Sequence, residues 1–153
     1  MKIKSLTIYC SASNKIDINY FKMAKEVAEL ISNYDIKVIY GGGNVGLMGI
    51  IAKTLADLKR EVIGIIPKFL IKKEKVSLKI NKLKIVSSMS KRKEYLFKLG
   101  DAFLILPGGT GTLEEVIEVL SWKILKLHNK PIIFLNFDNY WSPLIKQFEK
   151  IIE

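Results

Sequence analysis

Short runs of apolar residues recur along the chain, and each is about as long as one β-strand. Residues 6–10, with the letters LTIYC, are a clear case, because nearly every position there is hydrophobic. Continuous apolar runs of this length are typical of strands in a parallel sheet whose two faces are covered by helices. We therefore predict six buried strands, at residues 6–10, 37–40, 62–66, 84–86, 102–106 and 131–135.

The segments between these runs carry apolar residues at helical spacing. Phe21, Ala24, Ala28 and Ile31 form one stripe along residues 18–34. Further helices are expected at residues 46–59, 90–100, 112–127 and 141–152. Strands that alternate with helices in this way predict an α/β fold. The length suits one Rossmann-like, doubly wound domain over residues 1–153, with a mainly parallel sheet of about six strands.

Three of the predicted strand-to-helix turns have an unusual composition. The first reads CSASN at residues 10–14, and the second reads YGGGNVGLMG at residues 40–49. The third, PGGTGT at residues 107–112, follows the fifth strand. Residues 41–46 are called the first glycine loop here, and residues 107–112 the second. Because the carboxyl ends of parallel strands lie at one edge of the sheet, where ligands bind, we expect the three turns to meet there.

Glycine-rich turns before a helix are typical of anion sites, because backbone N–H groups and the helix N-terminus favour negative charge. Neither loop is a Walker A loop, since no glycine precedes Lys-Ser or Lys-Thr at the required spacing. The first glycine loop matches G-x-G-x-x-G, but no acidic residue stands about 20 positions after Gly46, as a dinucleotide site requires. The alternative interpretation is that these glycines serve only tight turns and close packing.

Glu114 and Glu115 follow the second glycine loop directly. One interpretation is a capping box, in which Thr112 is the N-cap and Glu115 binds back to its N–H. Acidic residues also suit the first turn of any helix electrostatically. The other interpretation is catalytic, with one carboxylate directed at the group that is attached to the bound anion. Spacing alone does not separate the two.

Composition limits the remaining site chemistry. Cys10 is the only cysteine and His128 the only histidine, so neither a disulfide within the chain nor a Cys/His metal cluster can form. No apolar run approaches the ~20 residues of a membrane helix, and the apolar stretch near the N-terminus is too short for a signal peptide. We expect a cytoplasmic protein that needs neither a metal ion nor a cofactor.

The net charge of +10 is concentrated in one segment. Residues 68–98 contain eleven basic and two acidic residues, a net charge of +9. This pattern is typical of a solvated lysine-rich face. It also fits a positive funnel that attracts a phosphorylated substrate. Nucleic-acid binding is the least favoured interpretation, because few aromatic residues are interleaved with the basic ones for base stacking.

The glycine loops and their surroundings resemble one known family. PGGTGTLEE at residues 107–115 is similar to the PGGxGTxxE motif of the LONELY GUY (LOG) proteins, cytokinin-activating nucleoside-monophosphate phosphoribohydrolases once labelled lysine decarboxylases. The resemblance covers most of the chain. It includes YGGGNVGLMG at 40–49, GIIPKFL at 64–70, SMSKRK at 88–93, the segment 100–125 and KPIIFLNFDNYWSPLI at 130–145.

The resemblance implies hydrolysis of the N-glycosidic bond of AMP or of an N6-substituted AMP, a cytokinin riboside 5′-monophosphate, to free base and ribose 5-phosphate. It implies that Arg92 and Glu115 are the catalytic pair. An ionised Glu115 suits this chemistry, because positive charge develops on the sugar as the bond breaks. The residues implied to bind the substrate are Gly108, Gly109, Thr110, Gly111 and Thr112 at the phosphate, and Ser13, Gly43, Met89 and Lys93 around the nucleotide.

The resemblance also implies a homodimer with its sites near the subunit boundary. Ser90 and Lys91 stand where many members of the family have His-Glu, which leaves the preferred base open. The sequence ends at Glu153, sooner than is usual in the family, which leaves the mode of assembly open. The alternative function is a non-catalytic nucleotide or cofactor carrier on the same scaffold, and the presence of both Arg92 and Glu115 favours the enzyme.

Overall fold

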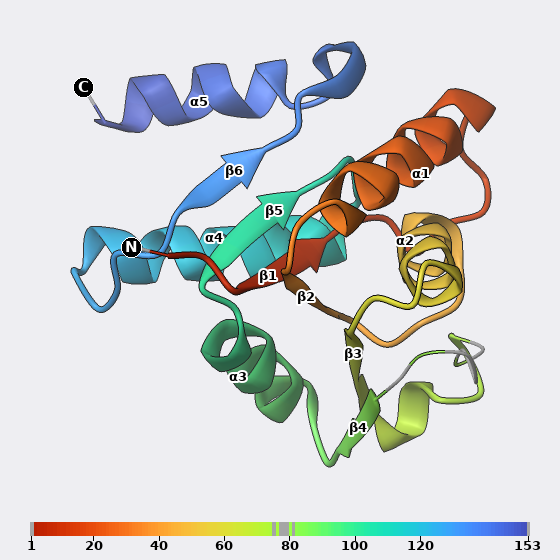
Figure 1. Ribbon diagram of the computed structural model, residues 1–153. Helices are drawn as coiled ribbons and strands as arrows, with labels where there is room; N and C mark the ends of the chain where they lie inside the picture. The colour runs from red at the N-terminus through yellow and green to blue at the C-terminus, as the bar shows by residue number, and fades with distance from the viewer. Residues whose placement is uncertain (1, 75, 77–79, 81, 153) are drawn as a thin grey trace.

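A six-stranded parallel sheet forms the centre of the molecule (Figure 1). The structure is a computed structural model, and it describes residues 2–74, 76, 80 and 82–152. The strand order is β4-β3-β2-β1-β5-β6, and every neighbouring pair is parallel. The strands are β1 (Ser5–Tyr9), β2 (Lys37–Tyr40), β3 (Val62–Pro67), β4 (Lys82–Val86), β5 (Ala102–Ile105) and β6 (Ile132–Phe134). The α/β fold with a parallel sheet is therefore confirmed.

Five α-helices connect and cover the strands. They are α1 (Ile18–Ser32), α2 (Gly46–Asp57), α3 (Met89–Leu99), α4 (Thr110–Ile124) and α5 (Ser142–Ile152), with short 3₁₀ turns η1 (Lys68–Leu70) and η2 (Phe137–Asn139). In the described part of the chain, no helix is both long and apolar enough to cross a membrane. The predicted helices differ from these mainly at their ends.

The strands alternate their side chains between two hydrophobic clusters, one on each face of the sheet. Val38 and Tyr40 face α1 and α2, which lie side by side in Figure 1. Ile39, between them, faces the cluster that includes Leu96 of α3 and Val116 of α4. Alternating neighbours can all be buried only when both faces are covered, which explains why the strands read as continuous apolar runs.

The chain reverses its direction across the sheet between β1 and β5. From β1 it proceeds through β2 and β3 to β4, and β5 then pairs with the other side of β1. The turns after β1 and β5 therefore diverge and leave a crevice at the carboxyl edge. Backbone hydrogen bonds connect the turns there: Ser11 N–H donates to Pro107 O at 3.0 Å, and Leu47 N–H donates to Ser11 O at 2.9 Å. The three unusual turns thus meet, as predicted.

Candidate active site

A cavity of about 450 Å³ lies at this carboxyl edge. The turns after β1, β2 and β5 and the starts of α3 and α4 surround it, together with one residue of the segment after β3. Its lining consists of Ile8, Tyr9, Cys10, Ser11, Ala12, Ser13, Gly41, Met48, Glu74, Met89, Arg92, Gly109, Thr110, Gly111, Thr112, Glu114 and Glu115.

Helix α4 begins at the cavity with backbone donors that the protein leaves free. Gly109 is its N-cap residue, and Leu113 N–H donates to Gly109 O at 3.0 Å. In the described part of the chain, no group accepts from the N–H groups of Thr110, Gly111 and Thr112. Unpaired N–H groups at the positive end of a helix dipole form a site for an anion.

The capping-box interpretation, in which Thr112 is the N-cap and Glu115 binds back to its N–H, is wrong. Thr112 is the third residue of α4 rather than its N-cap, so Glu115 lies in the second turn. The helix begins earlier than predicted because Gly109, with φ −93° and ψ −155°, already has the extended backbone of an N-cap. Glu115 is therefore not used to cap the helix and faces the cavity instead.

The start of α2, which follows the first glycine loop, in contrast uses its backbone donors within the protein. Gly46 N–H donates to Asn14 Oδ1 at 2.8 Å, and Asn44 N–H donates to Glu74 O at 2.9 Å. Leu47 and Met48, at the start of α2, both donate to Ser11 O. The first glycine loop and the start of α2 therefore join three turns together, whereas the donors at the start of α4 remain available to a ligand.

The space around the glycines also distinguishes the first glycine loop from the second. A Cβ atom on Gly46 would lie 2.6 Å from Ser11 O, and φ of Gly46 is +60°, so the backbone requires glycine there. A Cβ atom on Gly109 or Gly111 would meet no other atom within 4 Å, and neither residue has a positive φ. Packing and turn geometry do not explain these two glycines. The open space leaves the backbone at both positions accessible to a ligand.

Arg92 is buried at the wall of the cavity, with its guanidinium fixed from two sides. Its Nε donates to Ile65 O at 3.2 Å, and its Nη2 donates to Gly41 O at 2.8 Å. Ile65 lies within β3 and Gly41 directly follows β2, so two neighbouring strands orient the guanidinium. Among the described residues, only the Met89 sulfur, at 4.0 Å, accepts from Nη1. Arginine stays charged in any protein environment, so Nη1 is a cationic donor that remains available to a ligand.

Glu115 is half-buried and lines the same cavity from α4. Burial raises its pKa to about 7, since the surroundings disfavour the charged carboxylate. The positive charge of Arg92 opposes this shift, and the carboxylates of Glu114 and Glu74 add to it. A carboxyl group with a pKa near neutrality can hold or release a proton at physiological pH, as a general acid or base requires.

Glu74 is a residue of this site that the sequence analysis did not single out. Its Oε2 lies 3.5 Å from Nη2 of Arg92, and in the described part of the chain no group donates a hydrogen bond to that buried oxygen. Burial raises the pKa of the Glu74 carboxyl, and the charge of Arg92 opposes the rise. The available signal was weak: Glu74 is one of two acidic residues in the basic segment 68–98.

Comparison with known proteins identifies the family. The family described as "possible lysine decarboxylase" matches residues 48–153. LOG6 of Arabidopsis thaliana, named a probable cytokinin riboside 5′-monophosphate phosphoribohydrolase, is 39% identical over 99% of this chain and 76% of its own length. LOG1 of the same plant, a cytokinin riboside 5′-monophosphate phosphoribohydrolase, is 38% identical over 99% of this chain and 71% of its own. The chain belongs to the LOG family.

Solved structures similar to this LOG protein share its fold at low identity. A molybdenum cofactor carrier protein from Chlamydomonas reinhardtii has a TM-score of 0.78 and 19% identity, over 98% of this chain and 85% of that one. The molybdenum cofactor binding protein from Rippkaea orientalis has a TM-score of 0.72 and 22% identity, over 98% and 86%. At such identity the likeness concerns the Rossmann-like fold alone.

Most, but not all, of the site residues predicted from the LOG motifs line the cavity. Arg92, Glu115, Ser13, Met89, Gly109, Thr110, Gly111 and Thr112 line it. Gly43, Gly108 and Lys93 do not appear in its lining. A Cβ atom on Gly43 would lie 2.8 Å from Glu74 Oε2, and one on Gly108 would meet Thr112 Oγ1, so neighbouring side chains cover both glycines.

Lys93 is held by two carboxylates of α4. Its ammonium group donates to Glu114 and, at 2.9 Å, to Glu118. These contacts connect α3 to α4. Glu114 is largely exposed, although it also belongs to the cavity lining.

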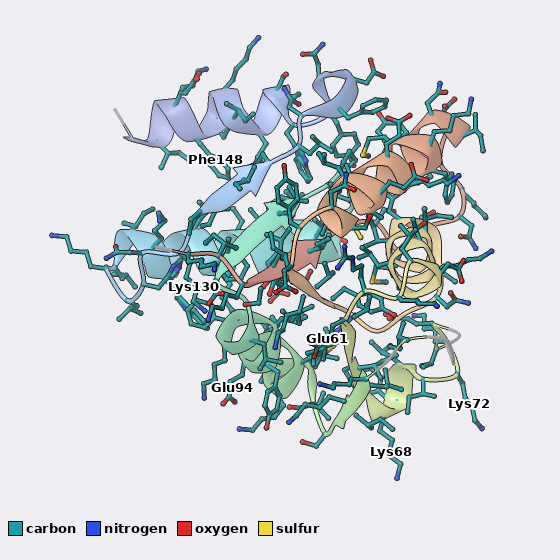
Figure 2. All side chains as sticks on the ribbon, in the orientation of Figure 1. Glu61, Lys68, Lys72, Glu94, Lys130 and Phe148 are labelled. Atoms are coloured by element: carbon teal, nitrogen blue, oxygen red, sulfur yellow. The ribbon has the colours of Figure 1, made fainter. Side chains whose placement is uncertain are left out.

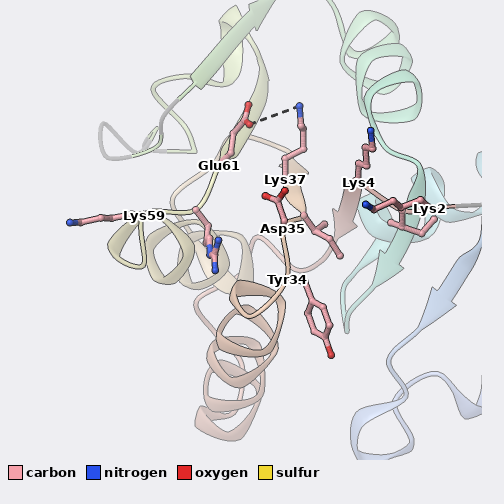
Figure 3. A pocket seen from close by; sticks show the side chains of 10 residues that line it. Lys2, Lys4, Tyr34, Asp35, Lys37, Lys59 and Glu61 are labelled. Atoms are coloured by element: carbon pink, nitrogen blue, oxygen red, sulfur yellow. Dashed lines mark ion pairs between the residues drawn. The ribbon is translucent and has the colours of Figure 1, made fainter.

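A larger cavity of about 740 Å³ lies at the opposite, amino edge of the LOG fold (Figure 3). It is lined by charged side chains such as Lys37 and Glu61, which form the ion pair drawn there at 3.9 Å. In open α/β sheets, ligands bind at the carboxyl edge, and exposed lysines alone do not build a site. The smaller cavity is therefore the candidate active site.

In the part of segment 68–98 that the structure describes, the basic side chains do not form one continuous positive face; Lys75 and Lys79 lie outside the described residues. Several of the segment's cations pair with carboxylates, as Lys82 does with Glu61 and as Lys91 and Lys98 do with Glu94. Lys68 and Lys72 project outward from the molecule (Figure 2). Exposed, dispersed charges of this kind agree best with the solvated face considered from the sequence.

Proposed function

We propose that this LOG-family protein hydrolyses the N-glycosidic bond of AMP, or of an N6-substituted AMP, to the free base and ribose 5-phosphate. The observation that carries the proposal is geometric. The free N–H groups at the start of α4, the guanidinium of Arg92 and the carboxyl of Glu115 all line one cavity. The names of the relatives, at 34–39% identity, support the same activity.

The 5′-phosphate of the nucleotide would bind at the start of α4. Three backbone donors and the helix dipole favour its negative charge there, and Gly109 and Gly111 let it approach the backbone closely. The ribose would then extend toward Glu115, which follows the second glycine loop on the same helix.

The carboxylate of Glu115 would serve the bond-breaking step. As the C1′–N bond breaks, the base departs with the bonding electron pair, and positive charge develops on the ribose. An ionised Glu115 stabilises that charge and accepts a proton from the water that attacks C1′. The departing base takes up a proton, so that base and ribose 5-phosphate are the balanced products. Arg92, through Nη1, would bind an oxygen of the substrate and favour the ionised form of Glu115.

Free base can be measured by chromatography after incubation with AMP and with isopentenyl-AMP. We expect base release by the wild type and a loss of at least 100-fold in Glu115→Gln, the usual scale for a group that assists proton transfer. Glu118→Gln is the matched control, because Glu118 lies one turn further along α4 and outside the cavity lining. Equal activity in both variants would contradict the proposed role of Glu115.

The carrier hypothesis makes a different prediction in the same assay. A carrier would bind AMP without releasing the base, whatever residue stands at position 115. Saturable AMP binding with no turnover by the wild type would therefore replace the hydrolase with the carrier. The solved structures of molybdenum cofactor carriers do not favour that outcome, because their identity of 17–22% supports the shared fold only.

A further inference from the structure

The second glycine loop contains a peptide bond whose orientation is only weakly fixed by the two residues that form it. Gly108 and Gly109 flank this bond, and glycine crosses between backbone conformations at little steric cost. Rotation of the peptide plane between them would exchange the positions of the Gly108 carbonyl and the Gly109 N–H group. An anion at the start of α4 would then face a carbonyl oxygen instead of a donor. A preformed anion site therefore needs a contact that holds this peptide.

Tyr140 supplies such a contact from a distant part of the chain. Its hydroxyl donates a hydrogen bond to the carbonyl oxygen of Gly108 at 2.6 Å, across 32 positions of sequence. The peptide is trans, so the Gly109 N–H group points opposite to the Gly108 carbonyl. Gly109 lines the cavity and Gly108 does not. The hydrogen bond thus holds the carbonyl on the side away from the cavity.

The ring of Tyr140 is itself held in place by packing. It makes edge-to-face contacts with Tyr20 of α1, at 6.0 Å between ring centroids, and with Trp141, at 4.9 Å. Its backbone N–H donates to Phe137 O at 3.0 Å, at the end of η2. Although Tyr140 is 40% exposed, these contacts direct its hydroxyl from the corner between β6 and α5.

We propose that Tyr140 is a positioning residue that holds the Gly108–Gly109 peptide with its N–H group toward the bound phosphate. The inference rests on the proposed function, since it takes the start of α4 as the 5′-phosphate site. Tyr140 does not line the cavity and touches no reacting atom. It acts only through the peptide that it holds.

The test compares ligands with and without a phosphate in wild type and Tyr140→Phe. Ribose 5-phosphate and adenine are suitable probes, because neither contains the bond that the enzyme cleaves. Binding is followed by NMR titration. We expect Tyr140→Phe to bind ribose 5-phosphate roughly two- to twelve-fold more weakly, the range that one net hydrogen bond contributes. Adenine should bind equally to both proteins. With AMP as substrate, KM should rise by the same factor while kcat changes little.

Tyr34→Phe is the matched control, because Tyr34 is exposed and lies at the opposite edge of the sheet. It should bind both probes as the wild type does. Unchanged binding of ribose 5-phosphate by Tyr140→Phe would overturn the inference, and so would an equal loss for both probes, which indicates a general change of the cavity. If the wild type neither cleaves AMP nor binds ribose 5-phosphate, the proposed function itself fails. If the wild type cleaves AMP and Tyr140→Phe binds ribose 5-phosphate as tightly as the wild type, only the proposed role of Tyr140 is contradicted.

Discussion

Arg92 and Glu115 share one cavity, but enclosure by protein affects their charges differently. Arg92 keeps its charge. Its guanidinium donates hydrogen bonds to the carbonyls of Gly41 and Ile65 and forms an ion pair with the carboxylate of Glu74. No hydrogen bond to Glu115 is found in the described part of the chain, and burial raises its pKa to about 7. A carboxylate that is ionised without partners costs stability, and such costs are typical of functional sites.

The cost at Glu115 predicts a pH-dependent effect on stability. Its pKa lies near 4.5 in an unfolded chain and near 7 in the fold, so the folded state favours the protonated carboxyl. This contribution to stability is present below about pH 4.5 and is lost as the pH rises through 7. Glu115→Gln should therefore unfold at a higher temperature than the wild type at pH 8, by the equivalent of ~3 kcal/mol. At pH 4 the two should be equal. Thermal unfolding at both pH values measures the difference, and equal melting at pH 8 would contradict the shifted pKa.

The same pKa predicts the pH dependence of the reaction. Because the proposed mechanism needs an ionised Glu115, kcat/KM for AMP should fall tenfold per pH unit on the acid side, with a midpoint of about 7. The Glu74 carboxylate helps to raise this pKa. In Glu74→Gln the midpoint should move to lower pH, whatever happens to the maximal rate. An unmoved midpoint would show that Glu74 does not influence Glu115.

Helices α2 and α4 both begin after a glycine loop, yet the structure gives the two loops different tasks. At α2 the backbone donors bind Ser11 and Asn14, so the loop holds the fold together. At α4 no described residue accepts from the donors, and the glycines have open space around them. By composition both loops were candidate anion sites, and the resemblance to the LOG family alone placed the phosphate at the second. The contacts distinguish the two loops independently of that resemblance.

This difference predicts opposite outcomes for two matched substitutions. Gly111→Ala should keep or raise thermal stability, because alanine favours a helix over glycine by up to ~1 kcal/mol and its Cβ meets no atom. It should nevertheless weaken the binding of ribose 5-phosphate. Gly46→Ala should destabilise the fold by ~1–3 kcal/mol or more, since φ is +60° and the Cβ would lie 2.6 Å from Ser11 O. Thermal unfolding and ligand titration of both variants measure the contrast. Unimpaired binding by Gly111→Ala would contradict the assigned phosphate site.

At the scale of the whole molecule, the end of α4 and the residues after it expose several large apolar side chains. Ile124, Leu125 and Leu127 are 72%, 66% and 67% exposed. Contiguous apolar side chains on a surface are typical of contacts between proteins. Helix α4 also carries Glu115 and the phosphate site, so a contact here would lie on the same helix as the candidate active site.

We propose that a second copy of the chain covers these residues in a homodimer, as the resemblance to the family implied. Light scattering after gel filtration should give twice the chain mass of 17.4 kDa. The double variant Ile124→Glu with Leu127→Glu should be monomeric, because buried unpaired carboxylates at an interface are costly. Ile18→Glu, which changes an equally exposed residue on α1, should stay dimeric. A monomeric wild type would contradict the dimer.

The sequence by itself determined the layered α/β fold and the approximate position of each strand and α-helix, because hydrophobic periodicity records which faces are buried. It also determined the two glycine loops and, through the LOG motifs, Arg92 and Glu115. These features depend on residues close together in the chain or on a pattern that a family shares.

Only the tertiary structure decided which groups face the cavity and which are already occupied. Glu74 reaches Arg92, and Tyr140 reaches Gly108, because the chain folds back over the carboxyl edge of the sheet. Lys93, next to Arg92 in sequence, is instead held by α4. Local spacing carries no record of such contacts. These contacts depend on the relative placement of elements. They in turn decide which donors and charges remain for a ligand.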